Sequence, residues 1–263
     1  MSVVLVEPLQ PGNVGAAARA MQNFGLRRLV LVAPRAYDPE RARWMAPGCA
    51  DLLAHARIVA TLDEALDGVH RAIGTTARHR RFGQPVLEPA EAAAVALDGD
   101  GVTALLFGRE DTGLSNDAIH RCGALLRIPT AEHASLNLAQ AVLLCCHALF
   151  EEGRRRGAEA PGRTLGGTRA RTTARVTRPG PKDRRADLVA LEPLAEELVS
   201  LLGQVGYLRG TAAAKVRLTA RSLLQREPMS VKEVEALRGM VGRIRWALHH
   251  PDEDWTAGRG RGR

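Results

Sequence analysis

The first 152 residues alternate short apolar runs with stretches whose apolar positions recur every three to four residues. The runs are typical of buried strands, and the stretches are typical of helices that pack one face on a core. The pattern predicts strands at residues 3–6, 29–33, 58–60, 71–74, 103–108 and 126–129, and helices at residues 13–24, 62–66, 88–96 and 135–152. This alternation indicates an α/β domain built on a parallel sheet that helices cover on both faces.

The pattern changes after residue 152. Residues 153–186 are rich in Gly, Pro, Thr and Arg without an apolar period, which is typical of a flexible linker. From residue 187 to residue 250, three stretches again show helical spacing with one apolar stripe each. We therefore predict an α/β domain at 1–152, a basic linker at 153–186, a small all-helical domain at 187–250 and a disordered tail at 251–263.

The positive charge of the chain is concentrated in the predicted linker. Residues 1–150 hold 14 Arg, no Lys and 15 Asp or Glu, a net charge of −1, whereas residues 153–186 hold 11 basic and 2 acidic residues, a net charge of +9. Residues 187–263 hold 12 basic and 10 acidic residues, a net charge of +2. A flexible basic segment can be an electrostatic arm for a phosphate backbone, and it can equally be a solvated spacer.

Neither a membrane segment nor a metal site is predicted. No apolar run reaches the ~18 residues that span a bilayer, and the chain begins in a strand pattern rather than in a signal peptide. The cysteines form no CxxC pair, so we expect buried thiols rather than zinc ligands or disulfides at Cys49, Cys122, Cys145 and Cys146. These features favour a cytoplasmic protein.

Three segments carry polar residues and glycines that a core does not need. The first, residues 11–26, places Gly12 and Gly15 after the first strand, where one interpretation is a phosphate-binding turn. Asn13 is a suitable N-cap for the helix that follows. Arg19 interrupts the small and apolar positions of this helix. A surface salt bridge is the ordinary explanation for a single arginine, and anion binding is the alternative.

The second segment, residues 105–116, continues a buried strand into Gly108, Arg109 and Glu110. A glycine at the carboxyl end of a strand lets a ligand approach the backbone closely, and ligands bind at that end of open α/β sheets. The alternative is an ordinary loop that ends in the N-cap of a short helix.

The third segment, residues 128–144, contains two polar residues before an almost wholly apolar helix. Ser135 is a suitable N-cap for that helix. Asn137 would then lie at the second helical position, where it has no capping role. Its presence suggests a site beside a buried face.

Together, the three segments resemble the motifs of the SpoU/TrmH (SPOUT) superfamily of RNA 2′-O-methyltransferases. N-x-G-A-x-x-R-x-M…F-G-L, F-G-R-E-x-x-G-L-S-N and I-P…S-L-N-L-A-Q-A-V match those motifs in order and spacing. The stretch GTTARHR at residues 74–80 and the helical stretch at residues 206–240 resemble the TrmJ-type branch, which acts on tRNA. The resemblance covers nearly everything outside the linker and the tail.

The resemblance implies an α/β domain with a trefoil knot near its C-terminal end, followed by a helical tRNA-binding extension. General rules of chain connectivity argue against knots, so the knot is expected from the resemblance alone. It also implies S-adenosylmethionine (SAM) as cofactor, tRNA as partner, and a homodimer whose active site lies across the interface. The cofactor contacts carried over are Thr75, Thr76, Ala77, Gly108, Ile128, Ala134, Ser135 and Leu136.

The implied reaction is methyl transfer to a ribose 2′-oxygen, at nucleotide 32 of the anticodon loop in the TrmJ-type branch. Arg19 matches the catalytic arginine of the family. A guanidinium is effectively never deprotonated, so we expect Arg19 to hold a phosphate and stabilise developing negative charge rather than act as a base. Glu110, Ser135 and Asn137 would orient Arg19 or the ribose. No metal is expected in this reaction.

Three other functions stay open. A doubly wound nucleotide-binding enzyme is disfavoured, because the first segment lacks the third glycine of G-x-G-x-x-G and no acidic residue ends the second strand. A non-enzymatic RNA-binding protein on the same fold is disfavoured by the presence of Arg19 and Asn137. An enzyme acting on ribosomal RNA is the third. Aromatic residues make up 3% of the chain, so we expect recognition by shape and phosphate contacts more than by base stacking.

Overall fold

The computed structural model describes residues 1–35, 37–77, 83–99, 101–132, 135–157, 184–208 and 212–250. In these residues seven strands form one parallel sheet in the order β3-β2-β1-β6-β4-β7-β5. The strands are β1 (Ser2–Val6), β2 (Leu29–Val32), β3 (Arg57–Val59), β4 (Arg71–Thr75), β5 (Val86–Leu87), β6 (Thr103–Phe107) and β7 (Ala124–Leu126). The predicted α/β fold with a parallel sheet is therefore confirmed.

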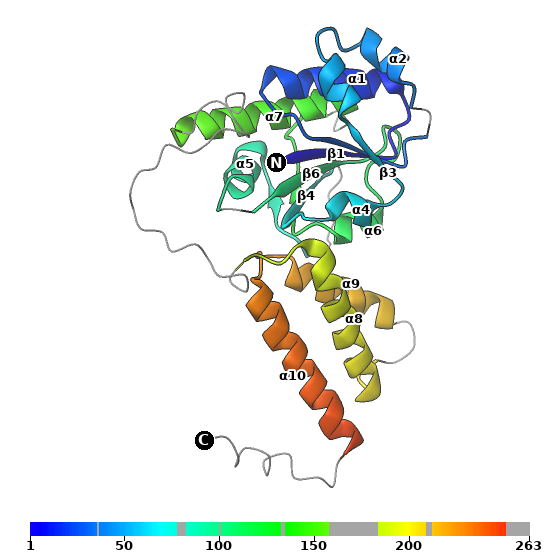
Figure 1. Ribbon diagram of the computed structural model, residues 1–263, viewed down its shortest axis with the longest axis vertical. Coiled ribbons are helices and arrows are strands. Elements are labelled where there is room, and N and C mark those ends of the chain that lie inside the picture. Colours follow the sequence, from blue (N-terminus) through cyan, green and yellow to red (C-terminus); the bar gives the residue numbers. More distant parts are fainter. Residues whose placement is uncertain are drawn as a thin grey trace.

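Helices cover both faces of the sheet (Figure 1). One face packs against α1 (Pro11–Asn23), α2 (Pro39–Trp44), α3 (Ala50–Ala54), α5 (Pro89–Ala96) and α7 (Leu138–Arg155). The other packs against α4 (Leu62–Leu66), α6 (Asn116–His120) and α8 (Leu188–Gln204). Because successive strand residues point to opposite faces, Val3 and Leu5 of β1 join the first core and Val4 joins the second.

The C-terminal region is helical, as the sequence predicts. It consists of α8, α9 (Ala212–Leu224) and α10 (Val231–His249), which lie below the sheet in Figure 1. The first turns of α8 bury Leu188, Leu191 and Leu194 in the same apolar cluster that contains Val4 of the central strand. The helical region thus shares a core with the sheet. Residues 158–183 of the predicted linker and the whole predicted tail, residues 251–263, lie outside the described residues. The trefoil knot stays a prediction.

Charged side chains also join the helical region to the α/β region. Arg121, buried in the loop after α6, pairs with Asp63 of α4 and Glu192 of α8. Arg221 of α9 pairs with the same glutamate at 2.8 Å. We call these four residues the Arg121–Glu192 network. Buried ion pairs contribute little net stability when complete, but the loss of one partner leaves a charge without compensation and costs about 3–5 kcal/mol.

The predicted start of the first long helix is wrong. The helix begins at Pro11, and Gln10 occupies the N-cap position without a side-chain hydrogen bond, so Asn13 is not a cap. Proline suits the first helical position because its missing N–H would have no partner there. Gly12 and Gly15 therefore lie inside α1 rather than in a phosphate-binding turn. Gly15 instead permits close packing, since a Cβ there would lie 1.9 Å from the backbone oxygen of Ala42 in α2.

The predicted start of the last helix of this region is also wrong. Ser135 precedes the helix, and Asn137 is the N-cap of α7. Its Oδ1 accepts hydrogen bonds from the backbone N–H groups of Ala139 at 2.9 Å and Gln140 at 3.4 Å. The Gln140 side chain in turn accepts from the Asn137 backbone N–H at 3.3 Å, which completes a capping box. Asn137 therefore has a capping role that its position in the sequence did not suggest.

We expect Gly15→Ala to lower the free energy of unfolding by about 2–3 kcal/mol, because the added methyl group would push α2 away from α1. Urea denaturation at fixed protein concentration measures this loss. Gly12→Ala in the same helix is the matched control, since a Cβ there would meet the Met45 Cγ at an ordinary 3.5 Å. Equal stability of the two variants would contradict the role of Gly15 in packing.

Candidate functional site

A cleft of about 380 Å³ opens at the carboxyl ends of β4, β6 and β7. This is the end of a parallel sheet at which α/β proteins bind their ligands. The second and third segments line it, and the first is joined to it through the hydrogen bond that Asn13 donates to Glu110. Its lining includes the predicted contacts Thr75, Thr76, Ala77, Gly108, Ile128, Ser135 and Leu136, together with Glu110. The eighth predicted contact, Ala134, lies outside the described residues, as do residues 78–80 of the GTTARHR stretch.

The lining of the cleft is partly apolar and partly polar. Phe107, Leu126 and Leu138 supply part of the apolar lining, whereas Thr76 and Ser135 bring hydroxyl groups. This combination suits a small molecule that has both a ring system and polar substituents.

The loop after β6 gives the cleft one of its walls. A Cβ on Gly108 would lie 2.1 Å from the backbone of Gly113 and Leu114, so the loop folds back onto the glycine. Gly113 adopts a positive φ of 73°, and its N–H donates to the carbonyl of Arg109 at 2.9 Å. The sequence suggested that Gly108 admits a ligand to the backbone. In the structure the close approach is made by the chain's own loop, and the glycine also lines the cleft.

An ion pair stiffens the tip of this loop. The Arg109 guanidinium donates to both carboxylate oxygens of Asp111, at 3.0 and 2.7 Å. These hydrogen bonds lower the pKa of Asp111 to about 2, so its carboxylate stays ionised at neutral pH. Arg109 also lies 3.5 Å from Glu7, which follows β1. These charges are therefore largely paired with one another.

Glu110 fastens the second segment to the first. Its carboxylate accepts hydrogen bonds from the backbone N–H groups of Leu9 at 2.9 Å and Gln10 at 3.2 Å, and from the Asn13 side chain at 2.9 Å. Since α1 has no cap of its own, Glu110 supplies the missing acceptors at its N-terminus, where the helix dipole favours a negative charge. Within one chain Glu110 therefore acts as a positioning residue for α1.

Asn13 connects the first segment to the third. While its Nδ2 donates to Glu110, its Oδ1 accepts a hydrogen bond from Asn137 Nδ2 at 3.0 Å. Glu110, Asn13 and Asn137 thus form a continuous chain of hydrogen bonds between the cleft, α1 and α7. The sequence offered Asn13 only as a cap, and that interpretation hid its part in the site. Its place at the head of N-x-G-A-x-x-R was the available signal.

Arg19 is separate from this group. Its side chain is exposed on α1 and does not line the cleft. Within the described part of the chain it forms no hydrogen bond or ion pair with Glu110, Ser135 or Asn137. It lies close enough to Cys49, before α3, for its charge to oppose the rise in the pKa of that thiol that burial causes. One chain therefore brings together three of the four predicted catalytic residues around the cleft and leaves Arg19 outside it.

The cysteines are free and buried, as predicted. Burial raises the pKa of Cys122 and Cys146 to about 12 and also raises that of Cys145, so these thiols stay protonated. In the described ranges, no cluster of three or more His, Cys, Asp or Glu is placed to bind a metal ion. Nor does any helix among the described residues have the length and apolar character to cross a membrane.

Comparison with known proteins adds independent findings. The SpoU rRNA Methylase family model matches residues 1–147. The tRNA (cytidine/uridine/adenosine-2′-O-)-methyltransferase TrmJ of Pseudomonas aeruginosa is 37% identical over 246 residues, which make up 91% of each chain. The tRNA (cytidine/uridine-2′-O-)-methyltransferase TrmJ of Cronobacter sakazakii is 35% identical, over 92% of this chain and 94% of its own.

A solved structure agrees over the same extent. The crystal structure of TrmJ from Z. mobilis ZM4 superposes with a TM-score of 0.74 at 29% identity, and the match covers 93% of this chain and 98% of that one. The similarity therefore includes the helical C-terminal region as well as the sheet.

Proposed function

The chain belongs to the SpoU rRNA Methylase family, and from this premise we propose that it transfers a methyl group from SAM to a ribose 2′-hydroxyl of tRNA. The observation that carries the proposal is the cleft, which residues of the second and third family motifs line, together with the hydrogen bonds by which Asn13 of the first motif joins Glu110 to Asn137. The TrmJ enzymes to which the chain is similar along nine-tenths of its length support tRNA as the substrate. Nucleotide 32 of the anticodon loop is the target that the TrmJ-type resemblance favours.

The described residues fit the proposed cofactor. The cleft volume of about 380 Å³ lies within the range of small-molecule sites. Its apolar lining can take up a base and an aliphatic chain. Thr75, Thr76 and Ala77 would hold the cofactor from the end of β4, with Ile128, Ser135 and Leu136 opposite. Thr75 is itself fixed, since its hydroxyl donates to the Leu106 carbonyl at 2.9 Å.

SAM would supply a methyl group bonded to a cationic sulfonium, and the rest of the cofactor would leave as a neutral thioether. The reaction therefore needs the two reactants in position and a route for the hydroxyl proton, and it does not need a metal. The protein's task is then to hold the two reactants in line. Arg19 would hold a phosphate of the RNA and stabilise negative charge that develops on the 2′-oxygen. Glu110 and Asn137 hold the ends of α1 and α7 at the cleft, and Ser135 lines it beside them.

Methylation in vitro tests this proposal. Purified protein with labelled SAM should methylate total tRNA, and mapping of the modified nucleotide should find a 2′-O-methyl group at position 32. Labelling of ribosomal RNA in place of tRNA would favour the rRNA alternative. Binding of tRNA without any methyl transfer would favour a non-enzymatic RNA-binding protein.

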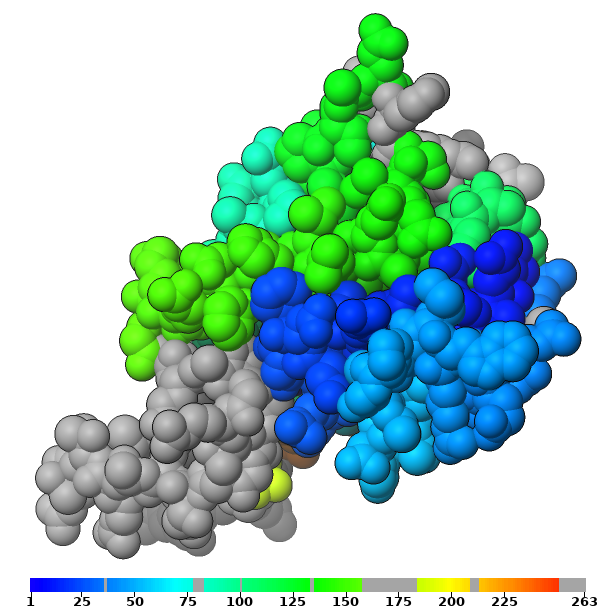
Figure 2. All heavy atoms as spheres, turned by 90° about the horizontal axis from the view of Figure 1, so that it is seen from above, coloured from blue at the N-terminus to red at the C-terminus, as the bar shows by residue number. Residues whose placement is uncertain are grey.

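We also propose that the active unit is a homodimer, as the family resemblance implies. Figure 2 looks down on the upper helical layer, where α1 lies between α7 and the α2–α3 segment. In this layer α7 buries one face in the core but exposes Leu143 and Leu144, at 39% and 42%. A second copy covering this face would remove apolar surface from water. It would also offer a way for Arg19 of one chain to reach the cleft of the other.

Leu143→Glu/Leu144→Glu should convert the dimer to a monomer and abolish methyl transfer, because it places four charges in the proposed interface. Analytical ultracentrifugation at micromolar concentration measures the first effect, and tRNA methylation the second. Ile58→Glu is the matched control, since Ile58 is exposed on the edge strand β3. A stable and active monomer, in the wild type or in the double variant, would refute the composite site.

A further inference from the structure

Trp44, at the end of α2, is 78% exposed, more than any other large hydrophobic side chain among the described residues. Met45 beside it is 53% exposed. The chain has three tryptophans in all. Such an exposed side chain contributes little to folding, because its apolar surface stays in water. Two adjacent exposed apolar residues in a chain poor in aromatics point to a binding role.

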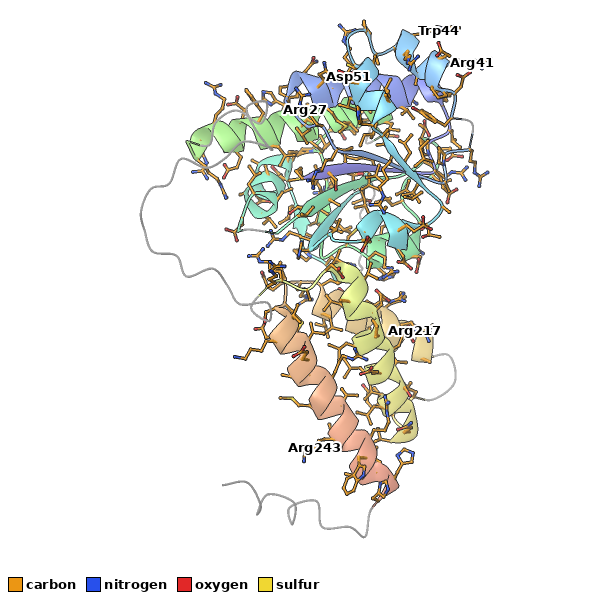
Figure 3. All side chains as sticks on the ribbon, in the orientation of Figure 1. Arg27, Arg41, Trp44, Asp51, Arg217 and Arg243 are labelled. Carbon is orange, nitrogen blue, oxygen red and sulfur yellow. The ribbon has the colours of Figure 1, made fainter. Side chains whose placement is uncertain are left out.

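This pair lies on the same side of the molecule as the proposed active site. Met45 packs toward Gly12 of α1, since its Cγ lies 3.5 Å from where a Cβ of that glycine would be. The next residue, Asn13, donates to the Glu110 carboxylate at the cleft. In Figure 3 Trp44 and Arg41 lie at the end of the upper layer toward which β1 runs, and the cleft opens at this carboxyl side of the parallel sheet. Trp44 therefore lies on the side of the molecule where a substrate must arrive.

The helix that carries Trp44 is held firmly. Asp38 caps it by accepting from the backbone N–H groups of Glu40 at 2.9 Å and Arg41 at 3.3 Å, and Pro39 fills the first turn. The close contact between Gly15 and Ala42 then fixes α2 against α1. The indole is therefore presented by a rigid support, which lowers the entropy lost when it binds a ligand.

The charges around Trp44 neutralise one another. Arg41 lies 3.4 Å from Asp38, and Arg43 lies 2.8 Å from Glu40. The surface thus offers a flat ring without a net positive field, so it suits the face of a nucleobase better than a run of phosphates. Unpaired bases in RNA loops are commonly recognised by stacking on aromatic side chains.

We propose that Trp44, supported by Met45, is a stacking surface for an unpaired base of the RNA next to the methylated nucleotide. The inference rests on the proposed function and specifies how the substrate loop is recognised.

Substitution of Trp44 tests the inference by steady-state kinetics. Trp44→Ala should raise the KM for tRNA about ten-fold, the usual effect of losing one base–aromatic stack. SAM affinity, and kcat at saturating tRNA, should stay within two-fold of wild type. Trp44→Phe should restore most of the affinity, because phenylalanine keeps an aromatic face for stacking. If the indole served only to fill volume in the fold, this recovery would not be expected. The slope of log affinity against log salt should not change, since no phosphate contact is lost. Ile58→Ala, which removes an exposed side chain on β3, is the matched control.

A fluorescence measurement locates the contact directly. In a Trp246→Phe/Trp255→Phe background Trp44 is the only tryptophan, and an unmodified anticodon stem-loop should quench its emission and shield it from acrylamide. The inference is overturned if Trp44→Ala binds tRNA as wild type does, or if the stem-loop leaves the emission unchanged. It is also overturned if Trp44→Ala dissociates the protein in the ultracentrifuge, because a second copy then covers this surface. If the wild type methylates no RNA, the proposed function itself fails. If the wild type is active and Trp44→Ala behaves like it, only the inference about Trp44 fails.

Discussion

Replacing Arg19 by alanine should lower methyl transfer to tRNA by about 100-fold or more, the usual loss when a group that stabilises developing oxyanion charge is removed. SAM affinity should stay within about two-fold of wild type, because Arg19 does not line the cleft of its own chain. The fold should be unaffected, since the side chain is exposed and alanine favours helix. SAM titration by calorimetry and tRNA methylation with saturating SAM measure the two effects.

Two further variants sharpen this test. Arg27→Ala removes an exposed arginine just beyond the end of α1, seen in Figure 3, and should leave activity unchanged. If the site is composite, mixing Arg19→Ala chains with Asn137→Ala chains should restore roughly a quarter of the activity, because half of the dimers would then hold one intact site. Activity of Arg19→Ala within a few-fold of wild type would remove Arg19 from the reaction. Failure of the mixed dimers would place Arg19 and Asn137 in the same half.

A second large effect is expected from the basic segment between the two folded regions, whose residues 158–183 lie outside those described. Replacing its six central basic residues by Gln should weaken tRNA binding by about 10–100-fold at low salt and flatten the slope of log affinity against log salt by up to about 4. The six are Arg163, Arg169, Arg171, Arg175, Arg178 and Lys182. We expect this because a segment rich in cationic side chains binds phosphates by releasing counterions. SAM binding and the methylated position should not change.

Two arginines of the predicted linker already have a partner in the folded region. Arg155 and Arg156 of the predicted linker pair with Glu152 at 2.6 Å and belong to the end of α7, so they are left in place. The matched control carries Lys at the five arginine positions and keeps Lys182, so it keeps the charge and should keep both the affinity and the salt slope. If the neutral variant binds tRNA with unaltered affinity and slope, the segment is a passive spacer. The RNA-binding surface would then lie on the folded regions alone.

The hydrophobic pattern predicted the strands β1, β2, β4 and β6 well because they are buried on both faces, whereas it placed β7 two residues too late. The run Leu29–Val32 is wholly apolar for this reason, and Thr103–Phe107 is apolar after its first residue and buried throughout. β5 could not be predicted in this way, since it is two residues long and partly exposed. It exists because Val86 pairs with Leu125 across the sheet edge. By contrast, Asp38 followed by Pro39 is a helix-start signal that was present in the sequence and could have revealed α2.

The family motifs indicated which residues gather at the cleft more reliably than the rules for helix caps did. Ser135 and Asn137 are both good N-caps, and the sequence around them does not decide between them. The choice is made by a partner 124 residues away, because Asn137 also donates to Asn13. Similarly, the local rule for Asn13 gave a cap where the structure gives a bridge to Glu110. Arg19 has no contact with Glu110, Ser135 or Asn137 among the described residues of one chain, so its place in a composite site stays a prediction.

The Arg121–Glu192 network has a consequence for how this protein can evolve. Three of its members are largely buried, Arg121 of the loop after α6, Glu192 of α8 and Arg221 of α9, whereas Asp63 of α4 is more exposed; the two halves of the chain therefore share one largely buried charge pattern. A change in a single member leaves an opposing charge stranded, and selection should remove it unless its counterpart changes too. In lineages of this family, Arg121, Glu192 and Arg221 should therefore be inherited as a set. An extension exchanged between two relatives would function in its new host only if both had kept the same version of that set.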